Sequence, residues 1–355
     1  MQVRTIPYVV AVCRKHTTWS WRFVMRSSAV VRVWFLGMVL AASGCGDATG
    51  PSGGDHGPAL LQGGRASALA AGGAVYQLDD FALYMPATAG GPRAVLVALG
   101  GPNTKGFASG EPFGAPLPQV EGALQAMGQS LRELADERGL AILGTSLAAM
   151  PAALESDARI LAALSAAADA SGQGGLSGLP ILLYGISGGG PEASEFAARH
   201  ADRIAGLVLK APLSVSAMTS GDQREVPTFM VLAQFDAFVD NVALAQAFAA
   251  NRGGGALWAM GMEPGVPHHS LSPSHKAATI EWMRSILGHR LAGSSGRLRT
   301  ISEQSGWLAD PSTGTVSPWG AYTRDPSGVS WFPTRASAMQ WLVLTGAAPS
   351  SAAAD

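Results

Sequence analysis

Ser187 stands in a G-x-S-x-G pentapeptide whose neighbours give it the setting of a nucleophile. Segment 180–190 reads Pro-Ile-Leu-Leu-Tyr-Gly-Ile-Ser-Gly-Gly-Gly, so the serine directly follows an apolar strand-like run and precedes a helix that opens near Pro191. A serine hydroxyl attacks a carbonyl when it is exposed beside a base and beside N–H groups that receive the oxyanion. A tight strand-to-helix turn exposes it, and Gly185 and Gly189 let strand and helix approach closely. The alternative is a Gly-rich loop that cradles phosphate, because the pentapeptide also arises by chance among 45 glycines.

Strand-like and helix-like segments alternate around Ser187. Continuous apolar runs predict strands, and helical spacing predicts helices. The predicted strands are 94–99, 140–145, 181–184, 204–210, 228–233 and 256–262, and the predicted helices are 119–138, 152–170, 191–200, 241–251 and 275–287. Such alternation predicts an α/β fold with a mostly parallel sheet covered by helices on both faces, and with ligands at the carboxyl ends of the strands. Ser187 lies at such an end.

With this order of elements, residues 75–288 resemble the α/β-hydrolase fold, in which the catalytic residues follow the chain order Ser, Asp or Glu, His. Ser187 matches the nucleophile. Asp236 lies after a strand in Ala-Gln-Phe-Asp-Ala-Phe-Val, which resembles the family's G-x-x-D-x-x-V with Ala233 in place of glycine. His268 ends the run Gly-Val-Pro-His, like the family's G-x-x-H. The resemblance implies that His268 takes the serine proton and that Asp236 orients the imidazole.

Both partners of the serine have neighbours of the same type. Asp240 is an alternate acid, although an aspartate there also suits the cap of the helix expected to begin near residue 241. His269 is an alternate base; adjacent loop residues usually point apart, so one of the two histidines reaches Ser187, and spacing favours His268. Two further histidines are assigned structural roles near helix ends, namely His200 and His275.

The resemblance also implies an oxyanion hole made of two backbone N–H groups. The first is that of Gly188, the residue after the nucleophile. The second comes from the run Leu-Gly-Gly-Pro-Asn at 99–103, which resembles the family's His-Gly-Gly-Pro loop. Because Pro102 has no N–H, Gly101 is the expected donor and Asn103 the reserve. A simple Gly-Pro turn is the alternative reading of this loop.

The first 44 residues have the composition of an export signal. They carry six Lys and Arg and no acid, and the apolar run 33–42 precedes Ser-Gly-Cys45. This end resembles a lipoprotein signal, in which the cysteine is lipidated, and Met25 would start a signal of ordinary length. The apolar run is shorter than the roughly 20 residues that span a bilayer. We therefore expect export, a lipid anchor on Cys45 at a bacterial membrane, and a flexible tether over residues 45–74.

Composition and motifs narrow the classes of ligand. Without residues 1–44 the chain carries 18 Lys and Arg against 25 Asp and Glu, a net charge of −7, so nucleic acid is not an expected partner. No H-E-x-x-H metal motif, P-loop lysine or dinucleotide fingerprint is present. We therefore expect neither a metal nor a cofactor.

Two further segments bear on access to the site. Only residues 211–226 separate the strands that flank the usual lid position, so we expect a minimal lid and an open cleft that suits bulky or polymeric esters. Loop 101–117 is the other segment that could cover the site.

The C-terminal extension 289–346 is expected to be largely irregular, with one helix near 336–344, and to pack its tryptophans on the core. A sugar or aryl platform is the alternative role of those tryptophans, and residues 347–355 are expected to be disordered.

These features predict an exported serine hydrolase, most simply a carboxylesterase. A peptidase of the same fold is the alternative enzyme, suggested by the Gly-Gly-Pro loop. The alternative from another class is a surface-tethered binding protein without activity, suggested by Ala233 and Leu99 at positions where the family has glycine and histidine.

Overall fold

The computed structural model describes residues 66–68, 73–78, 80–88, 90–100, 103–115, 117–145, 153–218, 220–291 and 297–347. The expected export signal, Cys45, most of the tether 45–74, Gly101 and the C-terminal tail from residue 348 lie outside the described residues.

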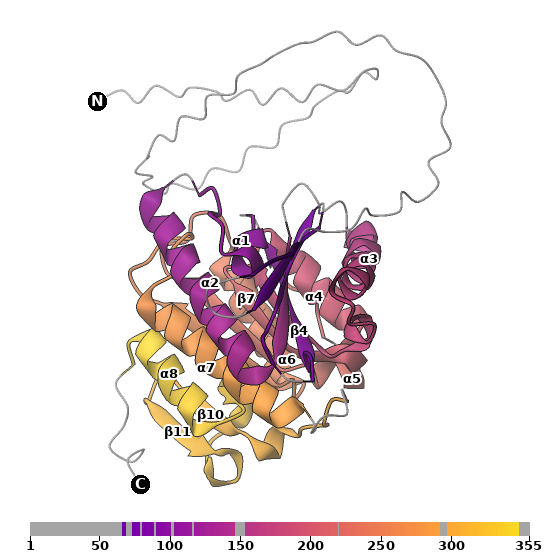
Figure 1. Cartoon of the computed structure of the whole chain (residues 1–355). Coiled ribbons are helices and arrows are strands. Elements are labelled where there is room, and N and C mark those ends of the chain that lie inside the picture. Colours follow the sequence, from indigo (N-terminus) through magenta and orange to yellow (C-terminus); the bar gives the residue numbers. More distant parts are fainter. Residues whose placement is uncertain are drawn as a thin grey trace, which may run out of the picture. The chain divides into compact units, whose positions relative to one another are not determined.

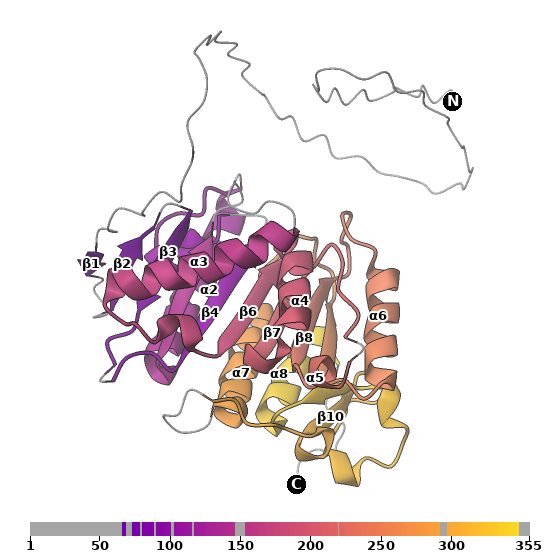
Figure 2. The ribbon, with the colours of Figure 1, turned by 90° about the vertical axis from the view of Figure 1, so that its right-hand side faces the viewer.

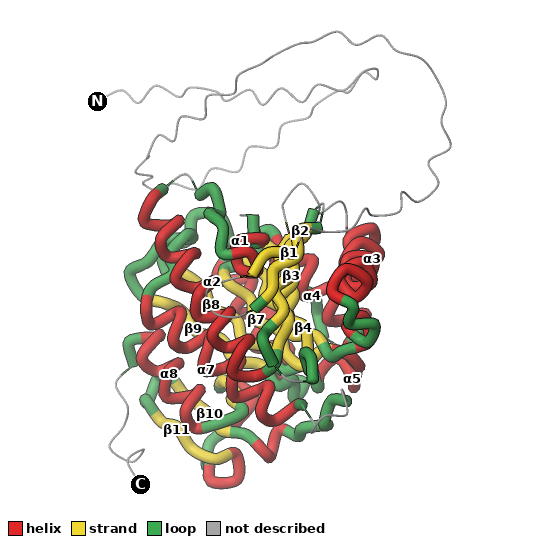
Figure 3. Tube along the Cα trace, in the orientation of Figure 1, coloured by secondary structure: helices red, strands yellow, loops and turns green. Residues whose placement is uncertain are grey.

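A nine-stranded sheet forms the centre of the described chain (Figures 1 and 3). Its order is β1-β2-β3-β5-β4-β6-β7-β8-β9. Strands β1 to β3 pair in antiparallel fashion and β3 also runs antiparallel to β5, whereas all pairs from β5 to β9 are parallel. The strands are β1 (Ala66–Ala68), β2 (Ala74–Gln77), β3 (Phe81–Met85), β4 (Ala94–Gly100), β5 (Leu140–Thr145), β6 (Ile181–Ile186), β7 (Ile204–Lys210), β8 (Thr228–Ala233) and β9 (Trp258–Glu263). The expected mostly parallel sheet is confirmed.

The antiparallel edge differs from the expectation that residues 45–74 form only a tether. Strand β1 reads Ala-Ser-Ala and pairs with β2, so regular structure begins earlier than predicted. Its pairing is made by backbone groups, which need no apolar side-chain pattern, and composition alone therefore does not reveal it.

Helices cover both faces of the sheet. One face is covered by α1 (Lys105–Ser109), α2 (Pro118–Arg138) and α7 (Pro273–Arg290) (Figure 1). The other carries α3 (Ala153–Ser171), α4 (Gly189–Arg199) and α6 (Asn241–Gly253), which stand in front of the sheet in Figure 2; α5 (Gly221–Arg224) is a short turn nearby. Each face has its own core of buried side chains.

Helix α2 illustrates how the sequence sets these elements. Proline at its first position and Glu121 in its first turn favour the N-terminus, and Gly139 ends it in the left-handed conformation. Its buried side chains recur at helical spacing and face the sheet, and they include Leu124, Met127, Leu131 and Leu134.

The C-terminal extension contains more regular structure than predicted. It forms a second sheet of order β11-β10-β12 and the helix α8, near the predicted 336–344. The bounds are β10 (Trp307–Asp310), β11 (Thr315–Pro318), β12 (Ser330–Phe332) and α8 (Arg335–Thr345). The strands are only three or four residues long and lie among Gly, Pro and Ser, so their pattern is too short to read from the sequence.

This extension packs on the outer strand of the main sheet. Ser330 Oγ bonds both the N–H and the carbonyl of Met260 in β9, and Trp341 Nε1–H donates to the same carbonyl at 2.9 Å. Trp331 and Trp341 are each 1% exposed and join the core that includes Trp282 of α7. Trp331 and Trp341 therefore pack the extension onto the domain, which is the first of the two roles expected from the sequence.

Among the described residues, no helix has both the length and the apolarity to cross a membrane.

Candidate active site

Ser187 occupies the turn between β6 and α4 with a strained backbone. Its φ is 53°, in the left-handed region that side chains other than glycine seldom adopt. Three backbone hydrogen bonds hold the turn: Ser187 N–H donates to the Lys210 carbonyl at 2.9 Å, and the Ser187 carbonyl accepts from Gly190 and Leu213. The serine is thus set at the carboxyl end of its strand, as the sequence predicted.

The glycines around the turn are required by close packing. A Cβ on Gly185 would lie 2.8 Å from the Cβ of Ala193, and one on Gly189 would lie 2.3 Å from the carbonyl carbon of Leu99. A Cβ on Gly190 would meet the Pro212 side chain at 2.4 Å. Side chains at these positions would push the helix off the sheet and move Ser187.

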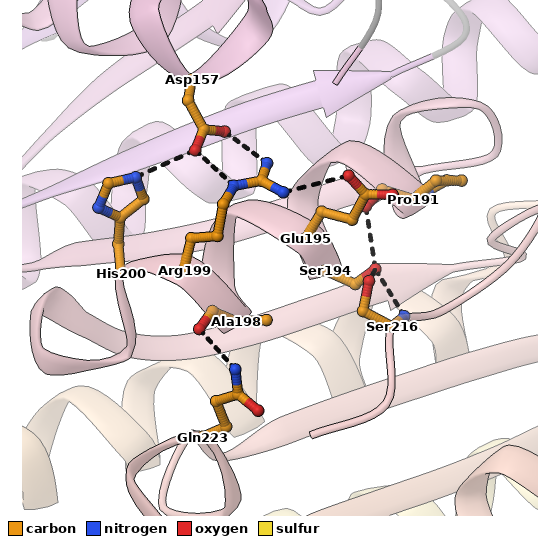
Figure 4. Close-up of polar contacts among 9 residues, drawn as sticks. All are labelled: Asp157, Pro191, Ser194, Glu195, Ala198, Arg199, His200, Ser216 and Gln223. Atoms are coloured by element: carbon orange, nitrogen blue, oxygen red, sulfur yellow. Dashed lines mark hydrogen bonds and ion pairs between the residues drawn. The ribbon is translucent and has the colours of Figure 1, made fainter. Parts of the chain in front are cut away.

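Polar contacts fix helix α4 behind the serine (Figure 4). Arg199 pairs with Asp157 of α3 through two N–H···O bonds of 2.7 and 2.8 Å, and it also contacts Glu195. In the middle of the helix, Ser194 Oγ accepts from the Ser216 N–H at 3.0 Å. The end of α4 is therefore bonded to α3, and its middle to the loop after β7.

Three side chains from separate segments form a hydrogen-bonded series. His268 Nε2 lies 2.8 Å from Ser187 Oγ, and its Nδ1 lies 2.6 Å from Asp236 Oδ2. The side chain of His268 is 5% exposed and that of Asp236 is fully buried. With the proton on Nδ1, the imidazole donates to Asp236 and Nε2 accepts from the serine hydroxyl. This is the arrangement in which a neutral histidine removes a serine proton.

The Asp236 carboxylate is held on both oxygens. Its Oδ1 accepts the N–H groups of Phe238 at 2.8 Å and Val239 at 3.1 Å, which leaves Oδ2 for His268. Asp240 has the structural position that the sequence suggested, because its side chain caps α6 by accepting from Val242 and Ala243. The structure therefore brings Asp236, and not Asp240, to the imidazole.

Among the described residues, no other histidine is hydrogen-bonded to Ser187, although His269 lines the same cavity. His269 is exposed and packs against Phe238, with ring centroids 5.6 Å apart. Partial burial and the neighbouring His268 lower its pKa. His200 Nε2 contacts Asp157 at the end of α4 (Figure 4). His275 is fully buried in the first turn of α7, where burial holds its pKa well below the usual value.

The expected oxyanion donors are only in part within the described residues. Gly188 is the N-cap of α4, so its N–H lies where the helix has unpaired donors and positive dipole character. Gly101 lies outside the described residues. Asn103 lines the cavity beside Ser187, with its Oδ1 accepting from the Lys105 N–H at 3.1 Å.

Thr104 anchors the loop after β4 and was not identified from the sequence. Its buried Oγ1 donates to the Ala98 carbonyl at 2.7 Å and accepts from the Thr145 N–H at 2.9 Å. A Cβ on Gly144 would lie 2.2 Å from the Thr104 carbonyl oxygen, so this loop packs directly on β5. No local motif marks such a threonine, because its partners lie on two different strands.

A cavity of about 450 Å³ opens beside Ser187 and His268. Most of its wall is apolar. Phe113, Ala115 and Leu117 precede helix α2, Val120 and Leu124 belong to α2, Ile186 ends β6, and Leu271 follows the histidines. Glu121 holds the loop because its carboxylate accepts from Phe113 and Ala115, which lowers the pKa of Glu121. The part of loop 101–117 that was expected to cover the site thus forms one wall of it.

Exposed apolar side chains lie on segments that contact Ser187, Asp236 and His268. Phe235 and Phe238 are 65% and 66% exposed on the loop that carries Asp236, and Phe238 packs against His268. Leu213, which donates its N–H to the Ser187 carbonyl, is 50% exposed, and the cavity residue Leu117 is 45% exposed. Apolar side chains are thus exposed next to both Ser187 and His268.

No group of three His, Cys, Asp or Glu side chains in the described part of the chain has the arrangement of a metal site.

Comparison with known proteins found no matching family model and no matching curated protein. Solved structures that resemble the chain include an S-formylglutathione hydrolase from Agrobacterium tumefaciens, 16% identical over 64% of this chain and 99% of that one, with a TM-score of 0.43. Esterase PE8 is 17% identical over 57% of this chain and 96% of its own, with a TM-score of 0.41. The Pyrococcus furiosus esterase Pf2001 is 11% identical over 64% and 92%, with a TM-score of 0.42.

The fold is identified from the chain's own architecture and not from these neighbours. The sheet is mostly parallel with helices on both faces, the serine turn joins β6 to α4, and the acid and the histidine follow β8 and β9. Together these features give the chain an α/β-hydrolase fold.

Proposed function

We propose that this protein is a serine hydrolase, and specifically a carboxylesterase that works through an acyl-enzyme on Ser187. The observation that supports this proposal is the hydrogen-bonded series of Ser187 Oγ, His268 and Asp236 beside an apolar cavity. Each group has a task in ester cleavage, and the strained turn presents the hydroxyl to the cavity.

In the first half of the reaction, Ser187 Oγ attacks the ester carbonyl carbon while His268 Nε2 takes the hydroxyl proton. The oxyanion that forms accepts a hydrogen bond from Gly188 N–H and from an N–H of the loop after β4. Asp236 stabilises the imidazolium. When the tetrahedral intermediate collapses, the ester C–O bond breaks and the alcohol leaves with the proton from His268 Nε2.

The second half repeats these steps with water. His268 removes a proton from a water molecule, which attacks the acyl carbonyl, and the collapse of the second intermediate returns the proton to Ser187 Oγ. The acid product leaves and the starting state is restored. No step needs a metal or a cofactor.

The lining of the cavity favours an apolar acyl group. Aliphatic and aromatic side chains form most of its wall. Phe238, which packs against the His268 ring, and Leu213, which donates to the Ser187 carbonyl, are also exposed apolar side chains. Burial of an apolar chain contributes about 0.8 kcal/mol for each CH₂ group. Esters of medium-length acids, including bulky ones, are therefore the substrates we propose.

A fluorophosphonate probe tests the proposed nucleophile. We expect covalent labelling of the wild-type protein and its loss in Ser187→Ala, because the probe reacts only with an activated hydroxyl. Ser270→Ala is the matched control, since Ser270 lines the same cavity and should leave labelling intact. Parallel assays with p-nitrophenyl esters and aminoacyl anilides separate an esterase from a peptidase. A folded wild-type protein that resists labelling would favour the binding protein instead.

We further propose, from the sequence alone, that the protein is exported and anchored through a lipid on Cys45. Growth of an expressing bacterium with an alkyne-tagged fatty acid is expected to label the protein, and Cys45→Ser should abolish the label because the acceptor thiol is lost. Cys13→Ser is the matched control and should leave labelling unchanged, since Cys13 lies within the expected signal. Equal labelling of Cys45→Ser and the wild type would refute the anchor.

A further inference from the structure

Lys210 is a buried cation beside the proposed site that the mechanism above does not use. It is the last residue of β7, and only 2% of it is exposed. It lines the same cavity as Ser187 and His268. No sequence motif marks it, because it ends an otherwise apolar strand.

Two hydrogen bonds connect Lys210 to the nucleophile and to the base. Its backbone carbonyl accepts from the Ser187 N–H at 2.9 Å. Its Nζ donates to the backbone carbonyl of His268 at 3.1 Å. Ser187 and His268 lie 81 positions apart in the chain, so their contact depends on how the two loops are held together. Lys210 is bonded to both loops.

The other backbone hydrogen bonds of the histidine loop, residues 264–272 between β9 and α7, do not reach the serine. The Phe235 N–H donates to the Val266 carbonyl, and the Gly265 N–H donates to Gln234 Oε1, so both bonds tie the loop to the segment after β8. The Ser270 N–H donates within the loop to Pro267. Within the described residues, the Lys210 ammonium is thus the group that hydrogen-bonds the backbone of loop 264–272 to the end of β7, next to Ser187.

The serine side of this link is itself rigid. Ala211, the residue after Lys210, has a φ of 44° and donates its N–H to the Val231 carbonyl at 2.8 Å. The end of β7 is therefore held between β6 and β8, and Lys210 reaches the histidine loop from a fixed base. A shift of its Nζ would be transmitted to His268 rather than absorbed by the strand.

The ammonium is retained at an energetic cost. Burial lowers the pKa of Lys210 to about 8, although the carboxylates of Glu263 on β9 and Asp236 after β8 oppose this shift. Lys210 in turn contributes to the low pKa values of His269 and of His275 on α7. An apolar side chain of similar length would avoid the cost of burying a charge. Burial of the charge thus disfavours a lysine at position 210, whereas the hydrogen bond from Nζ to the His268 carbonyl requires a donor there.

We propose that Lys210 is a positioning residue that sets the distance between Ser187 Oγ and His268 Nε2 by holding the His268 carbonyl to the end of β7. This inference rests on the proposed function, since positioning is judged by the rate of acyl transfer. Loss of the bond lets the histidine loop move away from the serine. A displacement of about 1 Å at such a site costs on the order of 100-fold in rate.

The test uses Lys210→Met, which keeps the length of the side chain and removes the donor. We expect kcat for p-nitrophenyl butyrate to fall 10- to 100-fold with KM changed by less than about threefold, since substrate contacts remain. The rate constant of phosphonylation by the fluorophosphonate should fall by the same factor. The downfield proton resonance of the short His268–Asp236 bond should shift or broaden. That resonance reports geometry without turnover.

Two other variants complete the test. Val208→Ala removes buried atoms from the same face of β7 and should destabilise the fold while leaving kcat unchanged, which separates packing from positioning. Lys210→Arg restores a charged donor and is expected to recover at least part of the lost kcat. The inference is overturned if Lys210→Met keeps kcat within twofold of the wild type, or keeps the downfield resonance unchanged. An absence of Ser187-dependent turnover and labelling in the wild type would instead refute the proposed function.

Discussion

His268→Ala is expected to lower kcat for ester hydrolysis by a factor on the order of 10⁴ to 10⁶, whereas the same change at His269 should lower it less than about fivefold. His268 Nε2 lies 2.8 Å from Ser187 Oγ, and its removal leaves the hydroxyl without a base. His269 is exposed and packs on Phe238. Steady-state kinetics with p-nitrophenyl butyrate, on protein shown to be folded by circular dichroism, measures both effects.

The pair of histidines provides an internal control for this result. The two variants remove the same side chain from neighbouring positions. A difference between their kcat values therefore reflects where each imidazole lies relative to Ser187. The double variant Ser187→Ala/His268→Ala should be no slower than either single variant, because the nucleophile and its base act as a unit. A larger loss in His269→Ala than in His268→Ala would contradict the proposed base.

Asp236→Asn is expected to lower kcat by about 10⁴-fold with little change in folding. The carboxylate accepts from Phe238 and Val239 on Oδ1 and faces His268 Nδ1 with Oδ2. An asparagine amide that keeps the two backbone bonds must place its NH₂ against Nδ1. The imidazole then carries its proton on Nε2 and cannot accept from the serine. Measurement of kcat from pH 6 to pH 9 checks that the loss is present throughout.

Asp240→Asn is the matched control for this change. Asp240 caps helix α6, and asparagine caps helices about as well as aspartate, so kcat and thermal stability should stay close to the wild type. If Asp240→Asn lost as much activity as Asp236→Asn, the acid would be misassigned. Activity of Asp236→Asn within about tenfold of the wild type would lead to the same conclusion.

Much of the architecture could be predicted because its signals are local. The apolar runs of β4 to β8 and the periodic side chains of α2 are read within a few residues, and the glycines around Ser187 mark a tight turn. Strand β1 could not be found in this way, since Ala-Ser-Ala carries no pattern. The short strands of the C-terminal sheet were missed for the same reason.

In the candidate site, too, local sequence patterns revealed some features and missed others. Its residue types could be read from the chain, but each acid and each histidine had a neighbour of the same type. Hydrogen bonds between distant segments distinguish Asp236 from Asp240 and His268 from His269. Thr104 and Lys210 had no sequence signal, because their importance lies in partners on other strands.

The sequence by itself determined the alternation of the longer strands and helices from β4 to α7, the turn at Ser187 and the chemical types of its partners, since these follow from contacts and propensities among near neighbours in the chain. Only the tertiary structure decided which imidazole faces the hydroxyl, which carboxylate faces that imidazole, and that a lysine from a third segment joins the two loops. Those choices depend on distances between residues far apart in sequence, which are set by how the sheet and its loops pack.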